Sequence, residues 1–318
     1  MFSRAGSRLA LRSAAVPKTS PSSINFVRNF QSTARNSVNS TAWKTAGIVA
    51  GAVGVAYTLY EWKPELMPSL PVAHAEAPPA FSDVKTYLDP TTKTPFPSTL
   101  VSPEGIKLQL VGTGVRKVSF LAIKVYAVGF YVSQKELEAA KAGKLEGWQG
   151  YTPERLIAPH TISAEEQKTQ PAGEALIDNL LEKADAAVVI IPLRNTSLPH
   201  LRDGFSRALV ARMKVPSVAA AFDDQAGERT GAALVEFKSF FPNGKLASGA
   251  PMELFYSAVN RSILFQIRES PSAPAQVLGT LKDGLLSQQL MVSYFSNTAA
   301  PSEELRKSVA MGLAGESR

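Results

Sequence analysis

Residues 106–132, IKLQLVGTGVRKVSFLAIKVYAVGFYV, constrain the fold of this 318-residue chain more than any other stretch. An apolar run opens the stretch, and β-branched and aromatic residues close it, which is a composition typical of strands. Gly112 and Gly114 lie between the two parts, and glycine permits either a positive φ or the close approach of another backbone. We therefore expect two strands joined by a turn at these glycines. Arg116, directly after the turn, then faces either a pocket or the solvent at a strand edge.

The C-terminal part of the chain mixes further strands and helices without regular βαβ alternation. Strands are predicted by short apolar runs over 186–193, 252–257 and 262–267. Helices are predicted by apolar spacing, N-cap residues or both over 133–144, 164–183, 197–213, 278–295 and 302–313. This mixture indicates an α+β domain.

Basic residues are concentrated at the N-terminus. Residues 1–44 contain seven Lys or Arg and no Asp or Glu, so the net charge of +7 comes from this part and the remainder is balanced. We therefore expect no nucleic-acid partner for the domain. An Arg- and Ser-rich segment without acids is typical of a mitochondrial transit peptide, which we place over 1–30. A disordered basic tail is the alternative.

An apolar segment over 43–62 follows, and it is long enough to cross a bilayer. Trp43 and Trp62 flank it as interfacial anchors, and Gly47 with Gly51 forms a G-x-x-x-G that permits helix pairing. A buried helix of a soluble protein is the alternative. Because positive charge is greater before the span than after it, we expect a single-pass protein of the mitochondrial inner membrane with its C-terminal domain in the intermembrane space.

Residues 63–103 are rich in Pro, Ala, Ser and Thr, which predicts a tether. A compact domain is expected over 104–318. The chain contains no cysteine, so disulfides, thiolate nucleophiles and covalently attached haem are excluded. The sequence also lacks G-x-S-x-G, H-E-x-x-H and Walker A motifs.

The G-x-G-x-R of residues 112–116, followed by the A-V-G-F-Y-V of residues 127–132, resembles the chalcone isomerase family. Phe-Pro-Asn-Gly at 241–244 and the order of the following elements agree with that family, so the resemblance covers roughly residues 95–315. With its N-terminal region the chain resembles the fungal mitochondrial members called altered inheritance of mitochondria proteins. The resemblance implies a chalcone isomerase-like fold, which is an antiparallel sheet covered by a layer of helices.

The resemblance also implies a set of site residues. The family's arginine after the two glycines stabilises a substrate oxyanion, and here it is Arg116. The family's other pocket positions correspond to Tyr126, His200, Arg207, Ser293 and the adjacent Tyr294. Because Tyr126 replaces a threonine, and His200 and Arg207 replace a tyrosine and an asparagine, we expect a pocket without true flavonoid isomerase activity.

Two histidines, His160 and His200, lie in the C-terminal body, and single histidines are most often surface or core residues. The resemblance to the fungal proteins implies haem as a cofactor, bound noncovalently with His200 as axial ligand. Our leading hypothesis is a membrane-anchored protein that binds a small hydrophobic or anionic ligand, either haem or a fatty acid, through Arg116. One alternative is an intramolecular lyase or isomerase in which Arg116 and Tyr126 are catalytic. Another is a structural partner in the membrane with a filled pocket.

Overall fold

The computed structural model of the chain describes residues 85–118, 122–221 and 224–316. The predicted transit peptide (1–30) and membrane span (43–62) lie outside these residues. Among the helices within them, none is both long and apolar enough to cross a bilayer. The described residues therefore belong to the C-terminal domain.

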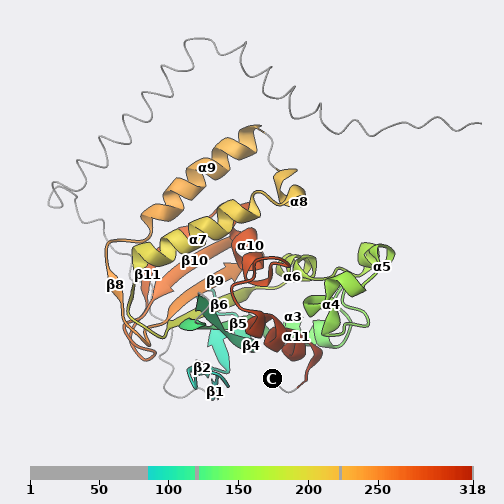
Figure 1. The fold of residues 1–318 in the computed structure, drawn as a ribbon, viewed down its shortest axis with the longest axis horizontal. Helices are drawn as coiled ribbons and strands as arrows, with labels where there is room; N and C mark the ends of the chain where they lie inside the picture. The colour runs from blue at the N-terminus through green and yellow to red at the C-terminus, as the bar shows by residue number, and fades with distance from the viewer. Residues whose placement is uncertain (1–84, 119–121, 222–223, 317–318) are drawn as a thin grey trace, which may run out of the picture. The chain divides into compact units, whose positions relative to one another are not determined.

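Within the described part of the chain, seven strands form one antiparallel sheet in the order β11-β10-β9-β6-β5-β4-β3 (Figure 1). Its strands are β3 (Thr99–Val101), β4 (Lys107–Val118), β5 (Ile123–Ser133), β6 (Ala186–Pro192), β9 (Met252–Ser257), β10 (Ser262–Ile267) and β11 (Gln276–Leu281). Two smaller pairs are formed by β1 (Thr86–Leu88) with β2 (Pro95–Pro97), and by β7 (Thr196–Ser197) with β8 (Lys245–Leu246).

Helices cover one face of this sheet, and the principal core lies between the two layers. The helical elements are α3 (Gln134–Lys141), α4 (Glu154–Ile157), η3 (Pro159–Thr161), α5 (Ala164–Thr169), α6 (Glu174–Leu181), α7 (Leu198–Arg212), α8 (Pro216–Ala219), α9 (Asp224–Ser239), α10 (Gly284–Val292), η4 (Ser293–Phe295) and α11 (Glu303–Ala314). The antiparallel sheet with its helical layer confirms the predicted α+β class.

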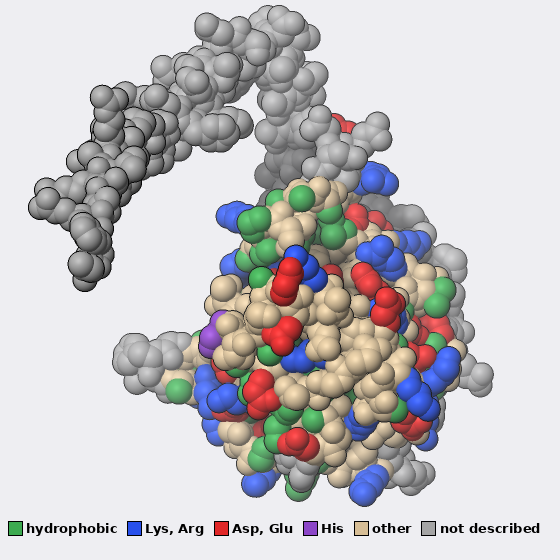
Figure 2. Space-filling model, turned by 90° about the vertical axis from the view of Figure 1, so that its right-hand side faces the viewer, with side chains coloured by type: hydrophobic (Ala, Val, Ile, Leu, Met, Phe, Trp, Pro, Cys, Tyr) green, Lys and Arg blue, Asp and Glu red, His purple; other side chains and the backbone are tan. Residues whose placement is uncertain are grey.

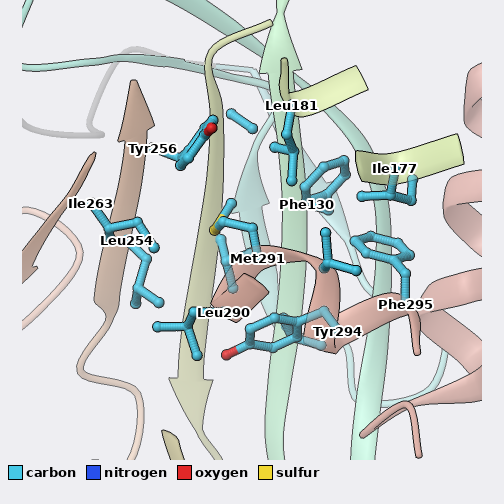
Figure 3. Packing of buried hydrophobic residues seen from close by; sticks show 14 of the residues in the cluster. Phe130, Ile177, Leu181, Leu254, Tyr256, Ile263, Leu290, Met291, Tyr294 and Phe295 are labelled. Carbon is cyan, nitrogen blue, oxygen red and sulfur yellow. The ribbon is translucent and has the colours of Figure 1, made fainter. Parts of the chain in front are cut away.

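Strand alternation explains how the sheet is buried on both faces. On β5, Val128 and Phe130 belong to the core under the helices, whereas Ala127 and Tyr131 belong to a second cluster on the opposite face. Figure 3 shows Phe130 packed with side chains from α6, α10 and η4. Its ring meets that of Phe295 edge-on, with 4.8 Å between ring centroids, a geometry that aromatic pairs favour.

The predicted turn at Gly112 and Gly114 is wrong, because β4 continues without interruption through both residues. Neither glycine has a positive φ. A Cβ on Gly112 would lie 2.5 Å from the backbone nitrogen of Val309, and a Cβ on Gly114 would lie 2.6 Å from the Cα of Leu305. The glycines therefore allow α11 to lie directly against β4. They serve the close approach of another backbone and not a turn.

Two predicted helices begin or end elsewhere. The helix expected over 164–183 is broken into α5 and α6 at Pro171 and Gly173, and Gly173 has a φ of +59°. The start of the helix expected over 278–295 belongs instead to strand β11, which pairs with β10. Helix α10 begins only after Asp283, whose side chain caps it by accepting from the backbone N–H of Leu286. A strand and an N-cap therefore stand where continuous helix was expected.

The compact domain begins before Glu104, so the prediction of a tether over 63–103 is wrong for its last part. Strand β3 pairs with β4 within the main sheet, and β1 and β2 form a hairpin ahead of it. Phe96 is completely buried and belongs to the second cluster. Proline and threonine are compatible with short edge strands, so the composition of this stretch does not distinguish a tether from a sheet edge.

Candidate ligand-binding site

A cavity of about 380 Å³ is lined by β4, β5, α7 and η4, together with the segment that follows η4. This volume is within the range of small-molecule sites. All six site residues predicted from the sequence line it, although they come from four elements: Arg116, Tyr126, His200, Arg207, Ser293 and Tyr294. The structure therefore brings the predicted residues together, and their roles in binding remain predictions.

Strand pairing positions the polar wall of the cavity. Arg116 on β4 is the register partner of Tyr126 on β5, and the guanidinium carbon lies 5.8 Å from the centroid of the Tyr126 ring. This distance is within cation–π range. Tyr294, from η4, completes the group, because the Tyr126 hydroxyl lies close enough to both the Arg116 guanidinium and the Tyr294 hydroxyl for each to affect its pKa.

Both tyrosines of this wall are buried, with exposures of 8% for Tyr126 and 3% for Tyr294. Burial raises the pKa of Tyr126, and the nearby Arg116 charge opposes that rise. Burial raises the pKa of Tyr294 well above its usual value, and the neighbouring Tyr126 adds to that rise. Both phenols are therefore protonated at neutral pH and act as hydrogen-bond donors.

Among the described residues that line the cavity, four are basic and none is acidic: Arg116, His200, Arg207 and Arg212. The outer surface differs, because basic and acidic side chains are interspersed on the face shown in Figure 2. None of the ion pairs formed within the described residues includes Arg116. Its guanidinium is therefore available to an anionic group of a ligand.

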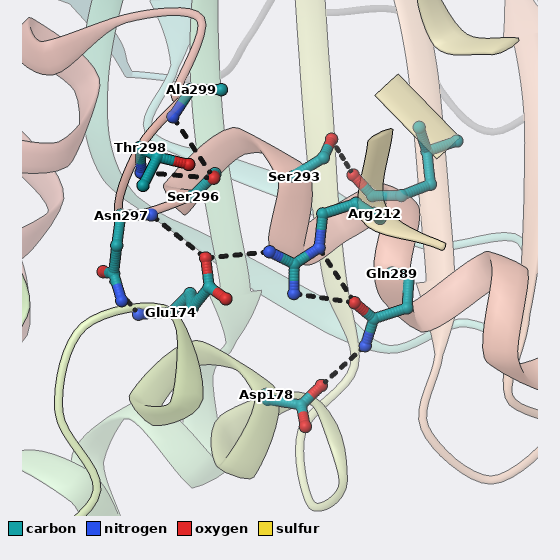
Figure 4. Close-up of polar contacts among 10 residues, drawn as sticks. Glu174, Asp178, Arg212, Gln289, Ser293, Ser296, Asn297, Thr298 and Ala299 are labelled. Carbon is teal, nitrogen blue, oxygen red and sulfur yellow. Dashed lines mark hydrogen bonds and ion pairs between the residues drawn. The ribbon is translucent and has the colours of Figure 1, made fainter. Parts of the chain in front are cut away.

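Arg212, in contrast, is already neutralised by protein groups (Figure 4). Its Nη1 lies 2.8 Å from Oε2 of Glu174, and its Nε and Nη2 donate to Oε1 of Gln289 at 3.0 and 2.8 Å. The Gln289 amide in turn donates to Asp178 at 3.4 Å, a carboxyl whose pKa is raised by burial. Arg212 thus joins α6, α7 and α10, and we assign it a structural role.

The serine and the histidine of the predicted set lie in different surroundings. Ser293 is buried, and its Oγ donates to the carbonyl oxygen of Leu290 at 2.6 Å, so it offers a ligand a lone pair and not a proton. His200 is exposed in the first turn of α7, where its backbone N–H bonds the N-cap hydroxyl of Ser197. His160 lies in η3 and does not line the cavity.

Helix α7 supplies the apolar wall, which the sequence analysis missed. Leu201 and Phe205 are buried, and they line the cavity together with Gly204, Ala208 and Ala211. The signal was present in the sequence, because small residues recur every three or four positions after His200 on a predicted helix. No group of three or more metal-binding side chains occurs in the part of the chain that the structure describes.

A curled antiparallel sheet, a helical layer and an arginine-bearing pocket between them define a chalcone isomerase-like domain. The chain belongs to the chalcone isomerase-like family, whose model matches residues 106–310. Two relatives are named altered inheritance of mitochondria protein 18, mitochondrial. The Debaryomyces hansenii protein is 27% identical over 237 residues, which cover 70% of this chain and 73% of that protein. The Eremothecium gossypii protein is 29% identical over 227 residues, covering 68% of this chain and 70% of that protein.

Proposed function

We propose that the domain binds a small, mainly apolar ligand that carries an anionic group, with a fatty acid as the leading candidate. The observation that supports this proposal is Arg116, which has no acidic partner within the described residues and lies beside two protonated phenols in a cavity with an apolar helical wall. A carboxylate accepts hydrogen bonds from both a guanidinium and a phenol. A few polar groups within an apolar lining are the usual composition of small-molecule sites.

Arg116→Gln is expected to weaken binding of a fluorescent long-chain carboxylate by about 10-fold to 100-fold, because a charge-assisted hydrogen bond is lost. The measurement is a fluorescence titration of the full-length protein. Arg202→Gln is the matched control, since Arg202 lies on the same helix as the apolar wall but pairs with Asp203 at 2.8 Å and does not line the cavity. Equal affinity of the Arg116 variant and the wild type would contradict the proposal.

Haem is the second candidate ligand, and the specific observation is that His200 lines the same cavity as Arg116. The donor set fits a noncovalent haem: an imidazole for the iron, a guanidinium without an ion-pair partner among the described residues for a carboxylate of the porphyrin, and an apolar wall for its ring. When bound, haem would supply redox or gas-binding chemistry at this site.

Full-length protein produced with haem supplied is expected to show a Soret band that is lost in His200→Ala and kept in His160→Ala. His160 is the matched control because it is also exposed and lies outside the cavity. Absence of a Soret band in the wild type would eliminate the haem candidate, and retention of the band in His200→Ala would assign the axial ligand to another residue.

The same polar wall supports an alternative function, an intramolecular lyase or isomerase. In that reaction Arg116 and Tyr126 would donate to an oxyanion that develops in the transition state. Mass spectrometry of the ligand after incubation distinguishes the two functions, because an enzyme returns an isomerised compound and a binding protein returns the compound unchanged.

We further propose that the chain is imported into mitochondria and anchored in the inner membrane, with this domain in the intermembrane space. The proposal is supported by the mitochondrial names of the relatives and by the composition of residues 1–30 and 43–62. Alkaline carbonate extraction of isolated mitochondria tests it: recovery of the protein in the soluble fraction would rule out the anchor.

A further inference from the structure

We propose that Gly204 of helix α7, together with Ala208, determines how large an apolar group the cavity admits. This inference rests on the proposed function, because it assigns the apolar part of the ligand to the α7 wall. The polar wall formed by Arg116, Tyr126 and Tyr294 then holds the anionic group, so the two parts of the ligand are recognised by different elements.

Helical spacing places the small residues on one face. His200, Gly204, Ala208 and Ala211 all line the cavity, and residues three or four apart lie on the same side of a helix. From the first to the last of them, the face extends about 16 Å along the helix axis, at a rise of 1.5 Å per residue. This face also carries His200 and Arg207, which line the cavity, but Gly204, Ala208 and Ala211 add no side chain larger than a methyl group to it.

Gly204 is not required by packing or by backbone conformation. Gly112, Gly114 and Gly312 each have backbone atoms of another element where a Cβ would lie, whereas no heavy atom lies within 4 Å of a Cβ built on Gly204. Its φ is also not positive. A glycine in a helix interior makes the helix less stable than an alanine would, so helix stability does not account for Gly204 either. What Gly204 does provide is the space that its missing side chain leaves in the cavity.

A side chain at position 204 would extend into that space, because the residue lines the cavity and its Cβ direction is open. Hydrophobic pockets discriminate ligands by about 10-fold to 200-fold for one methylene that does not fit. Bulk on the α7 wall should therefore exclude long apolar groups while leaving the contacts of the anionic group with Arg116 and Tyr126 intact.

The test is a displacement titration of full-length wild type, Gly204→Ala and Gly204→Leu with saturated carboxylic acids of increasing chain length. Gly231→Ala and Gly231→Leu are matched controls, because Gly231 also lies in a helix interior with nothing within 4 Å of its Cβ, but it is exposed on α9 and does not line the cavity. Thermal melts of all five proteins show whether each variant is folded.

Gly204→Leu is expected to weaken binding of a long-chain acid by about 10-fold or more, while the affinity for a short-chain acid changes by about twofold or less. Both alanine variants are expected to raise the melting temperature, since alanine favours helix, which separates a loss of binding from a loss of folding. Unchanged long-chain affinity in a folded Gly204→Leu would overturn the inference and leave the proposed function standing. A wild type that binds none of the acids would overturn both.

Discussion

Replacement of Gly312 by alanine is expected to lower the free energy of unfolding by about 3 kcal/mol or more. Gly312 lies in α11 where this helix crosses β4, and a Cβ there would lie 2.9 Å from the carbonyl carbon of Val111 and closer still to its oxygen. Both atoms belong to the backbone of Val111, which lies in β4 at the register shift between Leu110 and Gly112, so no side-chain rotation relieves the overlap. Helix α11 would have to move away from the sheet, separating Leu305 and Val309 from the core.

Urea denaturation of Gly312→Ala and the wild type measures this effect. Gly231→Ala is the control, because the same change on the exposed side of α9 is expected to stabilise the protein by up to about 1 kcal/mol. The opposite signs of the two results follow from packing alone, since the helix propensities are the same. If Gly312→Ala were as stable as the wild type, the contact between α11 and β4 would not be as close as described.

Arg268→Met is expected to destabilise the protein by about 3–5 kcal/mol, because it leaves a buried carboxylate without its counter-charge. Glu253 is completely buried on the face of the sheet opposite the helices, and Arg268 is 4% exposed. The Nε of Arg268 lies 3.1 and 3.2 Å from the two carboxylate oxygens of Glu253. Gln266 donates a further hydrogen bond to the same carboxylate, but an amide carries no charge to offset burial.

The destabilisation by Arg268→Met should depend on pH. Burial raises the pKa of Glu253, and the charge of Arg268 opposes that rise, so removal of Arg268 moves the pKa higher still. A carboxyl with a raised pKa keeps its proton in the folded state when the unfolded chain, with a pKa of about 4.3, has lost it. The variant is then most stable at a pH below the unfolded-chain pKa of Glu253. Its stability falls as the pH rises from there through the folded-state pKa of Glu253. We expect the deficit to be larger at pH 8 than at pH 4.5.

The double variant Glu253→Gln/Arg268→Met is the control for this prediction. It removes the buried charge, so most of the stability should return and the pH dependence should disappear. Denaturation curves at several pH values measure both effects. A single Arg268→Met variant as stable as the wild type at pH 8 would show that water reaches Glu253 in solution.

The residues of the candidate site were predictable from the sequence through a family pattern, but the strand pairing that brings them together was not. Arg116 and Tyr126 lie opposite each other because β4 and β5 are consecutive antiparallel strands, whereas the predicted turn at Gly112 and Gly114 would have placed both residues after the same turn. The pairing of Arg212 with Glu174 was not predictable, because these residues are far apart in the sequence and meet only when α6, α7 and α10 pack. That contact removes Arg212 from the arginines of the cavity that are available to a ligand.

The sequence by itself determined those features that depend on neighbouring residues. Examples are the completely buried strand β6, which follows from a continuous apolar run, and the start of α7, where Ser197 and Pro199 supply the N-cap and the first turn. Only the tertiary structure decided the use of each glycine and the limits of the domain. A glycine permits a turn, a close contact or an empty space, and the choice at Gly114, Gly312 or Gly204 depends on whether a distant element occupies the volume that a Cβ would need.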